Sequence, residues 1–270
     1  MRQALLVFFV SVLCSSCAFA AGAVRTEELL KVREEQYQAW KSSLSLERQK
    51  WEALLEENLG GHYLPLHKKD KLEGRQNEWE YVEDDPKLPR VLLIGDSISL
   101  GYTLPVRKAL AGKANVHRAP TNCGATPNGK SKLSIWLGSG KWDVIHFNFG
   151  IHDRNTKDFD YEKNLEEIVT SLEKTNAKLI WATSTPVPAD SRNGEKYTLE
   201  RCQQLNAIAL KVMQRHDVLI TDLYSVAQPK LKDLQLPNNV HFNVTGHKIL
   251  GDNVAVNIQR FLYQKGLLAQ

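Results

Sequence analysis

The sequence has no dense block of charge of either sign. It contains 35 Lys and Arg residues and 31 Asp and Glu residues, and its formal net charge is only +4. Proteins that bind nucleic acids usually concentrate Lys and Arg on one face or in one segment. The scattered charge therefore excludes nucleic acid as the expected partner.

Long apolar runs are absent after the N-terminus. The first run follows Arg2 and spans residues 4–13, and Ala18-Phe19-Ala20 then matches the small-x-small pattern of a cleavage site. No later segment is apolar for long enough to span a bilayer. Residues 1–20 therefore predict an export signal, and we expect a periplasmic or secreted mature protein with no integral membrane segment.

Cysteine is scarce, with only four residues in the chain. One alternative to simple cleavage is a lipoprotein anchored through Cys17, although Cys14 stands where a lipobox usually has leucine. Cleavage after residue 20 leaves Cys123 and Cys202 in a compartment where disulfides persist. A disulfide between them and two separate buried thiols are equally compatible with the sequence.

The N-terminal third has a helical pattern. Within residues 24–58, Leu, Val, Tyr and Trp recur at roughly helical spacing, which predicts one or two amphipathic helices. Gly60-Gly61 is expected to end them, with a polar stretch leading on to Pro89. We therefore divide the mature chain into a helical extension, residues 21–89, and a main domain, residues 90–270.

The main domain alternates short apolar runs with helical patterns. This alternation predicts an α/β fold, in which a parallel sheet has helices on both faces. Ligands of such sheets bind beyond the carboxyl ends of the strands. The expected strands are 91–94, 115–118, 144–149, 178–183 and 218–221, and the expected helices lie near 102–112, 130–138, 161–175, 195–214 and 245–264.

A hydroxyl follows the first expected strand. Gly95 permits a sharp turn, and Ser97 stands at the start of the next helix. Backbone N–H groups at a helix start are unpaired and can face a developing negative charge, which suits a nucleophile. A serine that only caps the helix is the alternative, and this stretch alone does not decide between them.

Other polar groups follow the later strands. Gly124 lies in a polar loop after the second strand, and residues 148–153 follow the third. His241, in a late loop, is a candidate general base because imidazole titrates near neutral pH. His146 lies inside an expected strand with no cysteine or carboxylate at ligand spacing, so we expect no metal site.

In order and spacing, these segments resemble the blocks of the SGNH or GDSL hydrolase superfamily. The resemblance covers about residues 88–265, and its most specific parts are Gly95-Asp96-Ser97-Ile98 and Val240-His241-Phe242. More narrowly, the blocks look like those of exported bacterial SGNH proteins. The resemblance implies a flavodoxin-like three-layer α/β/α sandwich with a mainly parallel five-stranded sheet. It also implies ester hydrolysis through an acyl-serine, without a metal or cofactor.

Carried onto this sequence, the resemblance makes Ser97 the nucleophile and His241 its base, with the N–H groups of Ser97 and Gly124 in the oxyanion hole. The third block departs from the superfamily's G-x-N-D, since His152 replaces the asparagine that donates to the oxyanion. We expect His152 to donate instead, with Asn148 as the fallback.

The last block departs from the pattern as well. The superfamily has Asp-x-x-His, whereas this chain has Asn238 three residues before the histidine. The carbonyl of Asn238, or a backbone carbonyl, is expected to accept from the histidine Nδ1–H. Asp233 is a distant candidate for the missing carboxylate. A Ser–His dyad aided by Asn238 should be slower than a full triad.

The sequence thus predicts an exported serine esterase that removes an acyl group, acetyl in first place, from a polysaccharide or a small-molecule ester. Two alternatives remain open. One is a glycan-binding protein that has the SGNH fold and weak or no catalysis, and the other is a hydrolase of the lipase or thioesterase kind.

Overall fold

The structure is a computed structural model that describes residues 28–188 and 198–267. The predicted export signal, residues 1–20, lies outside the described residues. The chain forms two compact units. One unit runs to Gln76, and the other begins at Asn77 and also includes Asn58–Gly60.

The first unit is helical, as predicted. Residues 28–42 are helical and precede α2 (Leu46–Asn58) and α3 (Gly60–Leu72). Inside the unit, the hydroxyl of Tyr37 donates to Glu52 Oε2 at 2.7 Å, and His67 Nε2 lies 2.7 Å from the same oxygen. The prediction that Gly60-Gly61 leads into a polar loop was wrong. Gly60 has a φ of +68°, which turns the chain directly into another helix.

Residues 77–89 belong to the second unit, although the sequence placed the boundary at residue 90. Asn115 ties this segment to the sheet. Its side-chain oxygen accepts from the Asp85 N–H at 3.0 Å, and its amide group donates to the carbonyls of Asp85 and Leu88 at 2.8 and 3.1 Å. A segment that satisfies its backbone through the sheet packs with the sheet.

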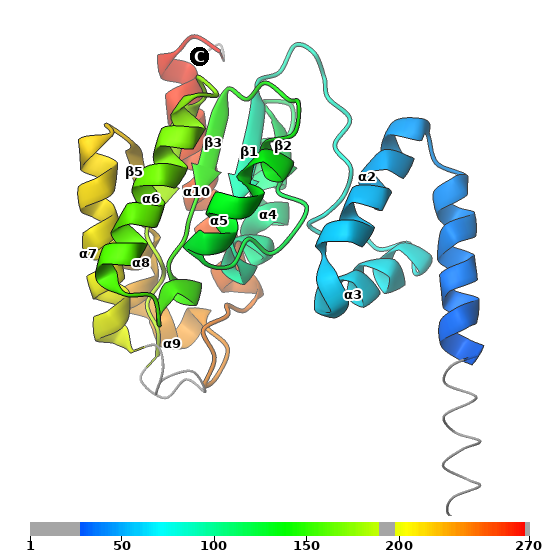
Figure 1. The fold of residues 1–270 in the computed structure, drawn as a ribbon, viewed down its shortest axis with the longest axis horizontal. Helices are drawn as coiled ribbons and strands as arrows, with labels where there is room; N and C mark the ends of the chain where they lie inside the picture. Colours follow the sequence, from blue (N-terminus) through cyan, green and yellow to red (C-terminus); the bar gives the residue numbers. More distant parts are fainter. Residues whose placement is uncertain (1–27, 189–197, 268–270) are drawn as a thin grey trace, which may run out of the picture. The chain divides into compact units, whose positions relative to one another are not determined.

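The second unit is built on a parallel sheet (Figure 1). Its strands are β1 (Arg90–Ile94), β2 (Asn115–Arg118), β3 (Val144–Phe147), β4 (Lys178–Ala182) and β5 (Leu219–Thr221). They lie in the order β2-β1-β3-β4-β5, and every neighbouring pair is parallel. This is the flavodoxin-like order, whose ligand crevice opens where the loops after β1 and β3 diverge. The predicted fold class is confirmed.

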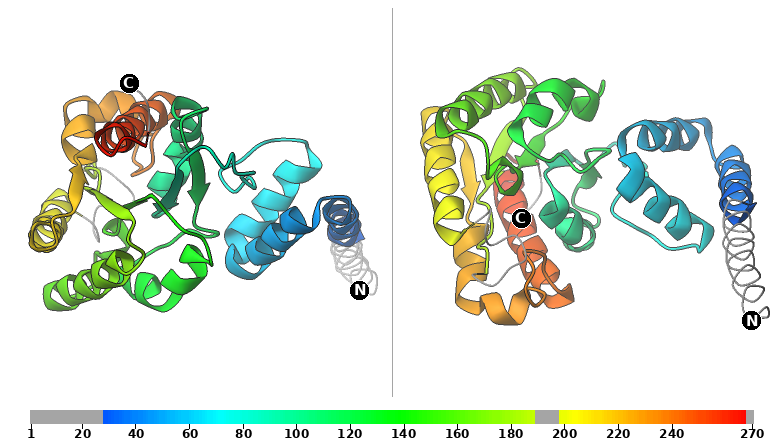
Figure 2. Two further views of the ribbon diagram at one scale, coloured as in Figure 1. Left: turned by 90° about the horizontal axis from the view of Figure 1, so that it is seen from above. Right: turned by 60° about the horizontal axis from the view of Figure 1, so that its bottom comes forward.

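Helices cover both faces of the sheet (Figures 1 and 2). Two long helices, α4 (Ser97–Ala109) and α10 (Val244–Gln264), pack on one face together with the short α8 (Leu223–Ala227). The other face carries α5 (Thr126–Leu137), α6 (Asp158–Glu173) and α7 (Leu199–Arg215). The remaining elements are short: η1 (Ile151–Asp153), η2 (Gln228–Lys230) and α9 (Leu231–Leu234).

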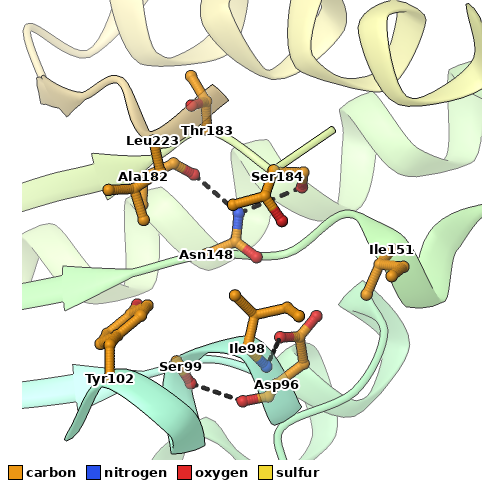
Figure 3. A pocket seen from close by; sticks show the side chains of 11 residues that line it. Asp96, Ile98, Ser99, Tyr102, Asn148, Ile151, Ala182, Thr183, Ser184 and Leu223 are labelled. Carbon is orange, nitrogen blue, oxygen red and sulfur yellow. Dashed lines mark hydrogen bonds between the residues drawn. The ribbon is translucent and has the colours of Figure 1, made fainter. Parts of the chain in front are cut away.

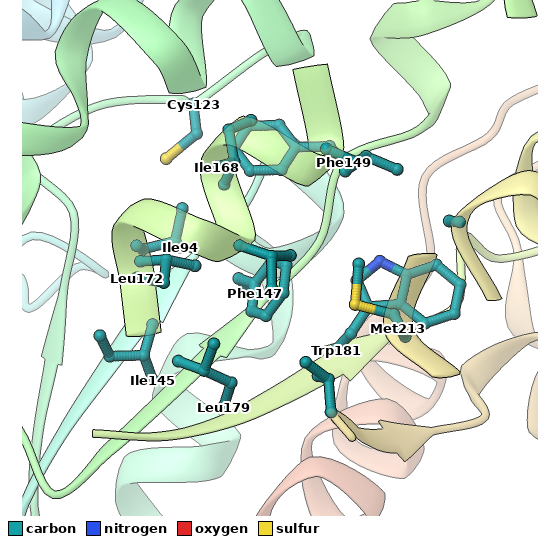
Figure 4. Packing of buried hydrophobic residues seen from close by; sticks show 14 of the residues in the cluster. Ile94, Cys123, Ile145, Phe147, Phe149, Ile168, Leu172, Leu179, Trp181 and Met213 are labelled. Carbon is teal, nitrogen blue, oxygen red and sulfur yellow. The ribbon is translucent and has the colours of Figure 1, made fainter. Parts of the chain in front are cut away.

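Side chains of the strands alternate between two buried clusters. In β1, Val91 and Leu93 face the α4 and α10 side, whereas Leu92 and Ile94 face the α5, α6 and α7 side. Figure 4 shows part of the cluster on the α5, α6 and α7 side, to which β1, β3 and β4 contribute from the sheet. Because both of its faces are buried, β1 has a continuous apolar run, residues 91–94, without polar alternation.

Two helices begin about a full turn or more earlier than the sequence predicted. α4 begins at Ser97 instead of near 102, and α5 begins at Thr126 instead of near 130. Their first turns contain Ser, Gly and Pro, so helical apolar spacing starts only in the second turn. Along the described part of the chain, no helix combines the length and the apolar character needed to cross a bilayer.

Candidate active site

Ser97 is the first residue of α4, directly after β1. Asp96 caps the helix, because its Oδ1 accepts from the Ile98 N–H at 2.9 Å. A side chain at position 95 would place its Cβ 2.7 Å from Ser99 Oγ, so the close approach of Ser99 requires glycine there. We call residues 95–97 the nucleophile turn. Capping is therefore the role of Asp96, and the Ser97 hydroxyl is left free for another partner.

That partner is His241. Its Nε2 lies 2.8 Å from Ser97 Oγ, and its Nδ1 lies 2.7 Å from Asn239 Oδ1. The same Asn239 oxygen accepts from the His241 backbone N–H at 3.1 Å. Because the oxygen can only accept, the ring proton is on Nδ1 and the Nε2 lone pair faces the hydroxyl. In this arrangement His241 can take the proton of Ser97.

The acceptor expected from Asn238 is supplied by Asn239, so that prediction was wrong by one residue. Asn238 is exposed and has a φ of +52°, which makes it the left-handed residue of the turn. Asn239 then accepts from the backbone two residues ahead, which is an Asx turn. The side chain of Asp233 is exposed, and its carbonyl accepts from Asn243 Nδ2 at 2.7 Å. The spacing of an Asn two residues before the histidine is the signal that sequence reasoning missed.

The electrostatic environment keeps His241 neutral. Burial is the main cause that lowers its pKa below 6.5, and the nearby His152 lowers it further, whereas the Asp96 carboxylate opposes both. A general base must be unprotonated to act. His241 is therefore in its basic form at neutral pH and somewhat below it.

His152 lies beside the nucleophile turn. It belongs to η1, its side chain is 38% exposed, and its Nε2 is 4.0 Å from Asp96 Oδ2. Asn148, the fallback donor, has both amide hydrogens occupied, since it donates to Ala182 O at 2.7 Å and to Ser184 Oγ at 3.3 Å (Figure 3). Of the two, His152 is the one that remains accessible to a substrate.

Gly124 also lies near the nucleophile turn. The preceding residue, Cys123, donates its N–H to the Gly95 carbonyl at 3.1 Å, which joins the two loops. Gly124 has a φ of +64°, and its N–H donates to Asn122 Oδ1 at 3.1 Å. To face an oxyanion, this N–H must exchange the Asn122 side chain for the substrate oxygen.

Asp153 anchors the helix that follows the Gly124 loop, a role that the sequence did not suggest. It is fully buried, and it accepts from the Thr126 N–H at 3.0 Å and from the Thr126 hydroxyl at 2.6 Å. The Thr156 hydroxyl also donates to it, at 3.2 Å. Burial raises the pKa of Asp153, and these hydrogen bonds oppose the rise. The carboxylate thus fixes the first turn of α5.

A small cavity lies beside the nucleophile turn. Its volume is about 20 Å³, which is room for one water molecule. Ile98 and Ile151 supply apolar walls, and Asn148 and Ser184 supply polar ones (Figure 3).

Both cysteines of the main domain are free and buried, so no disulfide joins Cys123 to Cys202. Burial raises the pKa of Cys123 to about 12, which keeps this thiol protonated and unreactive. Within residues 28–188 and 198–267, no three His, Cys, Asp or Glu side chains gather as a metal ion would require.

Solved structures with this fold include two ester hydrolases. A lipase/acylhydrolase from Enterococcus faecalis is 22% identical, with a TM-score of 0.58 over 64% of this chain and 97% of that one. An acetylxylan esterase from Geobacillus stearothermophilus is 18% identical, with a TM-score of 0.53 over 63% of this chain and 94% of that one. At these identities the likeness establishes the fold alone. No curated protein sequence matches the chain.

Family membership comes from the sequence itself. The GDSL-like Lipase/Acylhydrolase family matches residues 93–249, which is more than half of the chain. The match begins within β1 and ends inside α10, so it includes both Ser97 and His241. The chain therefore belongs to the GDSL-like lipase/acylhydrolase family of SGNH ester hydrolases.

Proposed function

We propose that this protein is an exported serine esterase that removes short acyl groups, acetyl in first place, from carbohydrate or small-molecule esters. One observation carries the proposal: the Ser97 hydroxyl lies 2.8 Å from His241 Nε2 while Asn239 holds Nδ1. A hydroxyl, a base and a group that orients the base are the minimum for nucleophilic catalysis.

In the proposed reaction, Ser97 Oγ attacks the ester carbonyl carbon while its proton passes to His241 Nε2. The tetrahedral intermediate then collapses, the bond to the alcohol oxygen breaks, and His241 returns the proton to that oxygen. A water molecule, deprotonated by His241, attacks the acyl-serine and releases the acid and the free hydroxyl. Throughout, Asn239 accepts from the Nδ1–H and keeps the ring in place.

We assign the oxyanion to three donors: the N–H groups of Ser97 and Gly124, and the ring of His152. Removal of one such donor typically costs about 10²- to 10³-fold in rate. Asn239 supplies no negative charge to stabilise the imidazolium. The Asp96 carboxylate, which opposes the low pKa of His241, provides part of that stabilisation.

The preference for acetyl is supported by the cavity of about 20 Å³ next to the nucleophile turn. Its apolar walls, Ile98 and Ile151, can contact the methyl group of an acetyl ester. An acetylxylan esterase among the proteins of similar fold makes a carbohydrate acetyl ester a reasonable first substrate. Export rests on the pattern of residues 1–20, with lipidation of Cys17 as the alternative.

Purified mature protein tests the proposal. It should hydrolyse p-nitrophenyl acetate, and a serine-directed organophosphonate should add its mass to the peptide that contains Ser97. Ser97→Ala should abolish both while the melting temperature stays close to that of the wild type. Hydrolysis that survives in Ser97→Ala would refute the assignment.

Two controls separate the alternatives. A glycan-binding protein with a dead site should neither hydrolyse the ester nor take up the label. A lipase or thioesterase should prefer p-nitrophenyl octanoate or an acyl thioester over the acetate.

A further inference from the structure

We propose that Arg118 is a positioning residue, which holds the nucleophile turn and strengthens the oxyanion donor of Ser97. This inference rests on the proposed function. Arg118 is the last residue of β2, and it is only 2% exposed. Resemblance to the SGNH blocks did not point to it, because it lies between the first and second blocks.

The hydrogen bonds of the Arg118 guanidinium all go to the nucleophile turn and the start of α4. Nη2 donates to the Gly95 carbonyl at 2.9 Å and to the Asp96 carbonyl at 3.4 Å. Nη1 donates to Ser99 Oγ at 2.8 Å and to Thr103 Oγ1 at 3.3 Å. All four acceptors belong to the nucleophile turn or to the first two turns of α4. A single buried side chain therefore fixes the geometry around Ser97.

The charge of Arg118 is not neutralised by direct contact. Among the described residues, no carboxylate lies within ion-pair distance of it, and its acceptors are all neutral oxygens. Burial lowers its pKa from the usual value. A buried cation without a paired carboxylate costs several kcal/mol. The charge is directed instead at the peptide groups of the turn.

One of those peptide groups contains the proposed oxyanion donor. The Asp96 carbonyl and the Ser97 N–H belong to the same amide. That carbonyl accepts from Arg118, from Ser99 Oγ at 2.7 Å and from the Leu100 N–H at 3.1 Å. Hydrogen bonds to an amide oxygen polarise the amide and make its N–H a better donor. The Ser97 N–H is thereby strengthened before the oxyanion forms.

The Gly95 carbonyl, another acceptor of Arg118, connects the two loops that carry the proposed backbone donors of the oxyanion hole. The Gly95 carbonyl accepts from Arg118 and also from the N–H of Cys123, at 3.1 Å. Cys123 directly precedes Gly124, the other proposed backbone donor. By holding this shared carbonyl, Arg118 sets the spacing between the two donors. Preorganised donors of this kind need no rearrangement when charge develops.

The test compares Arg118→Met, which removes the charge, with Arg118→Lys, which keeps the charge but loses the two-pronged donor. Arg107→Met is the matched control. Arg107 is a half-buried arginine of α4 that donates to the carbonyls of Val116 and Glu80, at 3.0 and 3.4 Å, and to no atom of the nucleophile turn. For each protein, prolonged labelling with diethyl p-nitrophenyl phosphate gives the fraction of molecules whose Ser97 is reactive. The acylation rate with p-nitrophenyl acetate is then divided by that fraction, so that misfolded molecules do not lower the result.

We expect Arg118→Met to lower the acylation rate per labelled serine by about 10²-fold, with KM changed less than about twofold. Arg118→Lys should lose about tenfold. Arg107→Met should lose thermal stability but keep the wild-type rate per labelled serine.

Several results would decide against Arg118. If either soluble Arg118 variant keeps the wild-type acylation rate per labelled serine, Arg118 has only a structural role. An equal loss of rate in Arg107→Met would show that the loss comes from general destabilisation. Failure of the wild type itself to label or hydrolyse would overturn the proposed esterase first, and this inference with it.

Discussion

Asn239 Oδ1 lies 2.7 Å from His241 Nδ1, in the place where a triad would have a carboxylate. The contact is local, since the same oxygen closes an Asx turn on the His241 backbone. The ring is therefore oriented by a neutral group, and the charge that develops on it must be stabilised by more distant residues.

Asn239→Ala should reduce kcat/KM for p-nitrophenyl acetate by about 10²-fold, because the imidazole loses its acceptor and samples other tautomers and orientations. Asn238→Ala removes a neighbouring amide that is exposed, and it should change kcat/KM by less than about twofold. Steady-state rates of the two variants at one pH make the comparison. Equal losses would show that Asn239 does not orient the ring.

The pH profile should report the low pKa of His241. Because burial lowers that pKa, the midpoint of the acidic limb of kcat/KM should lie at a pH below 6.5. Asn239→Asp adds a carboxylate that favours the imidazolium, so its acidic limb should move to higher pH. Asn238→Asp provides the control for a general charge effect. A limb that stays in place in Asn239→Asp would contradict the assignment of His241 as base.

Ile151→Ala should relax the preference for acetyl. Ile151 is an apolar wall of the cavity of about 20 Å³, and its truncation makes room for additional methylene groups. One methylene in an apolar pocket is worth about 1–3 kcal/mol in discrimination. The ratio of kcat/KM for the acetate and butyrate p-nitrophenyl esters should therefore fall at least about tenfold. Lys130→Ala, on the exposed surface of α5, should leave the ratio unchanged.

His146 should make the fold sensitive to acid. It is fully buried in β3, neither ring nitrogen has a hydrogen-bond partner, and burial lowers its pKa to about 3. Between pH 6.5 and 3, the unfolded chain binds a proton that the folded chain does not, so the free energy of unfolding falls as the pH falls. From pH 7 to pH 4.5 this loss is about 3 kcal/mol.

Urea unfolding of His146→Leu at these two pH values checks the prediction, since the variant should lose about 3 kcal/mol less than the wild type. His216→Gln is a control of opposite sign. Burial lowers the pKa of His216, but its contacts with Glu166 and Glu173 together outweigh burial and raise the pKa, so its stabilisation is greatest at low pH and is lost as the pH rises. An acid loss in His146→Leu equal to that of the wild type would refute the role of His146.

Much of the architecture could be read from local pattern. Apolar runs of strand length predicted the central strands β1, β3 and β4, because strands buried on both faces need apolar residues. The edge strands β2 and β5 were placed by the alternation of strands with helical patterns. The first residues of the helices were harder to predict from the sequence. The first turn of α4 is specified by the cap at Asp96 and by the close approach of Ser99 to Gly95, neither of which gives an apolar period.

The sequence by itself determined which groups follow each strand, and a parallel sheet necessarily brings those strand ends to one edge. Ser97, Gly124 and His152 were therefore identifiable in advance as neighbours, whereas His241, which follows no strand directly, was joined to them by the resemblance to the SGNH blocks. Only the tertiary structure decided which atoms meet there. It put Asn239 rather than Asn238 on the ring, occupied the N–H of Gly124 with Asn122, and aimed the buried Arg118 at the turn. Such contacts depend on side-chain directions and on distances across loops, and the hydrophobic period and the spacing of motifs give no information about either.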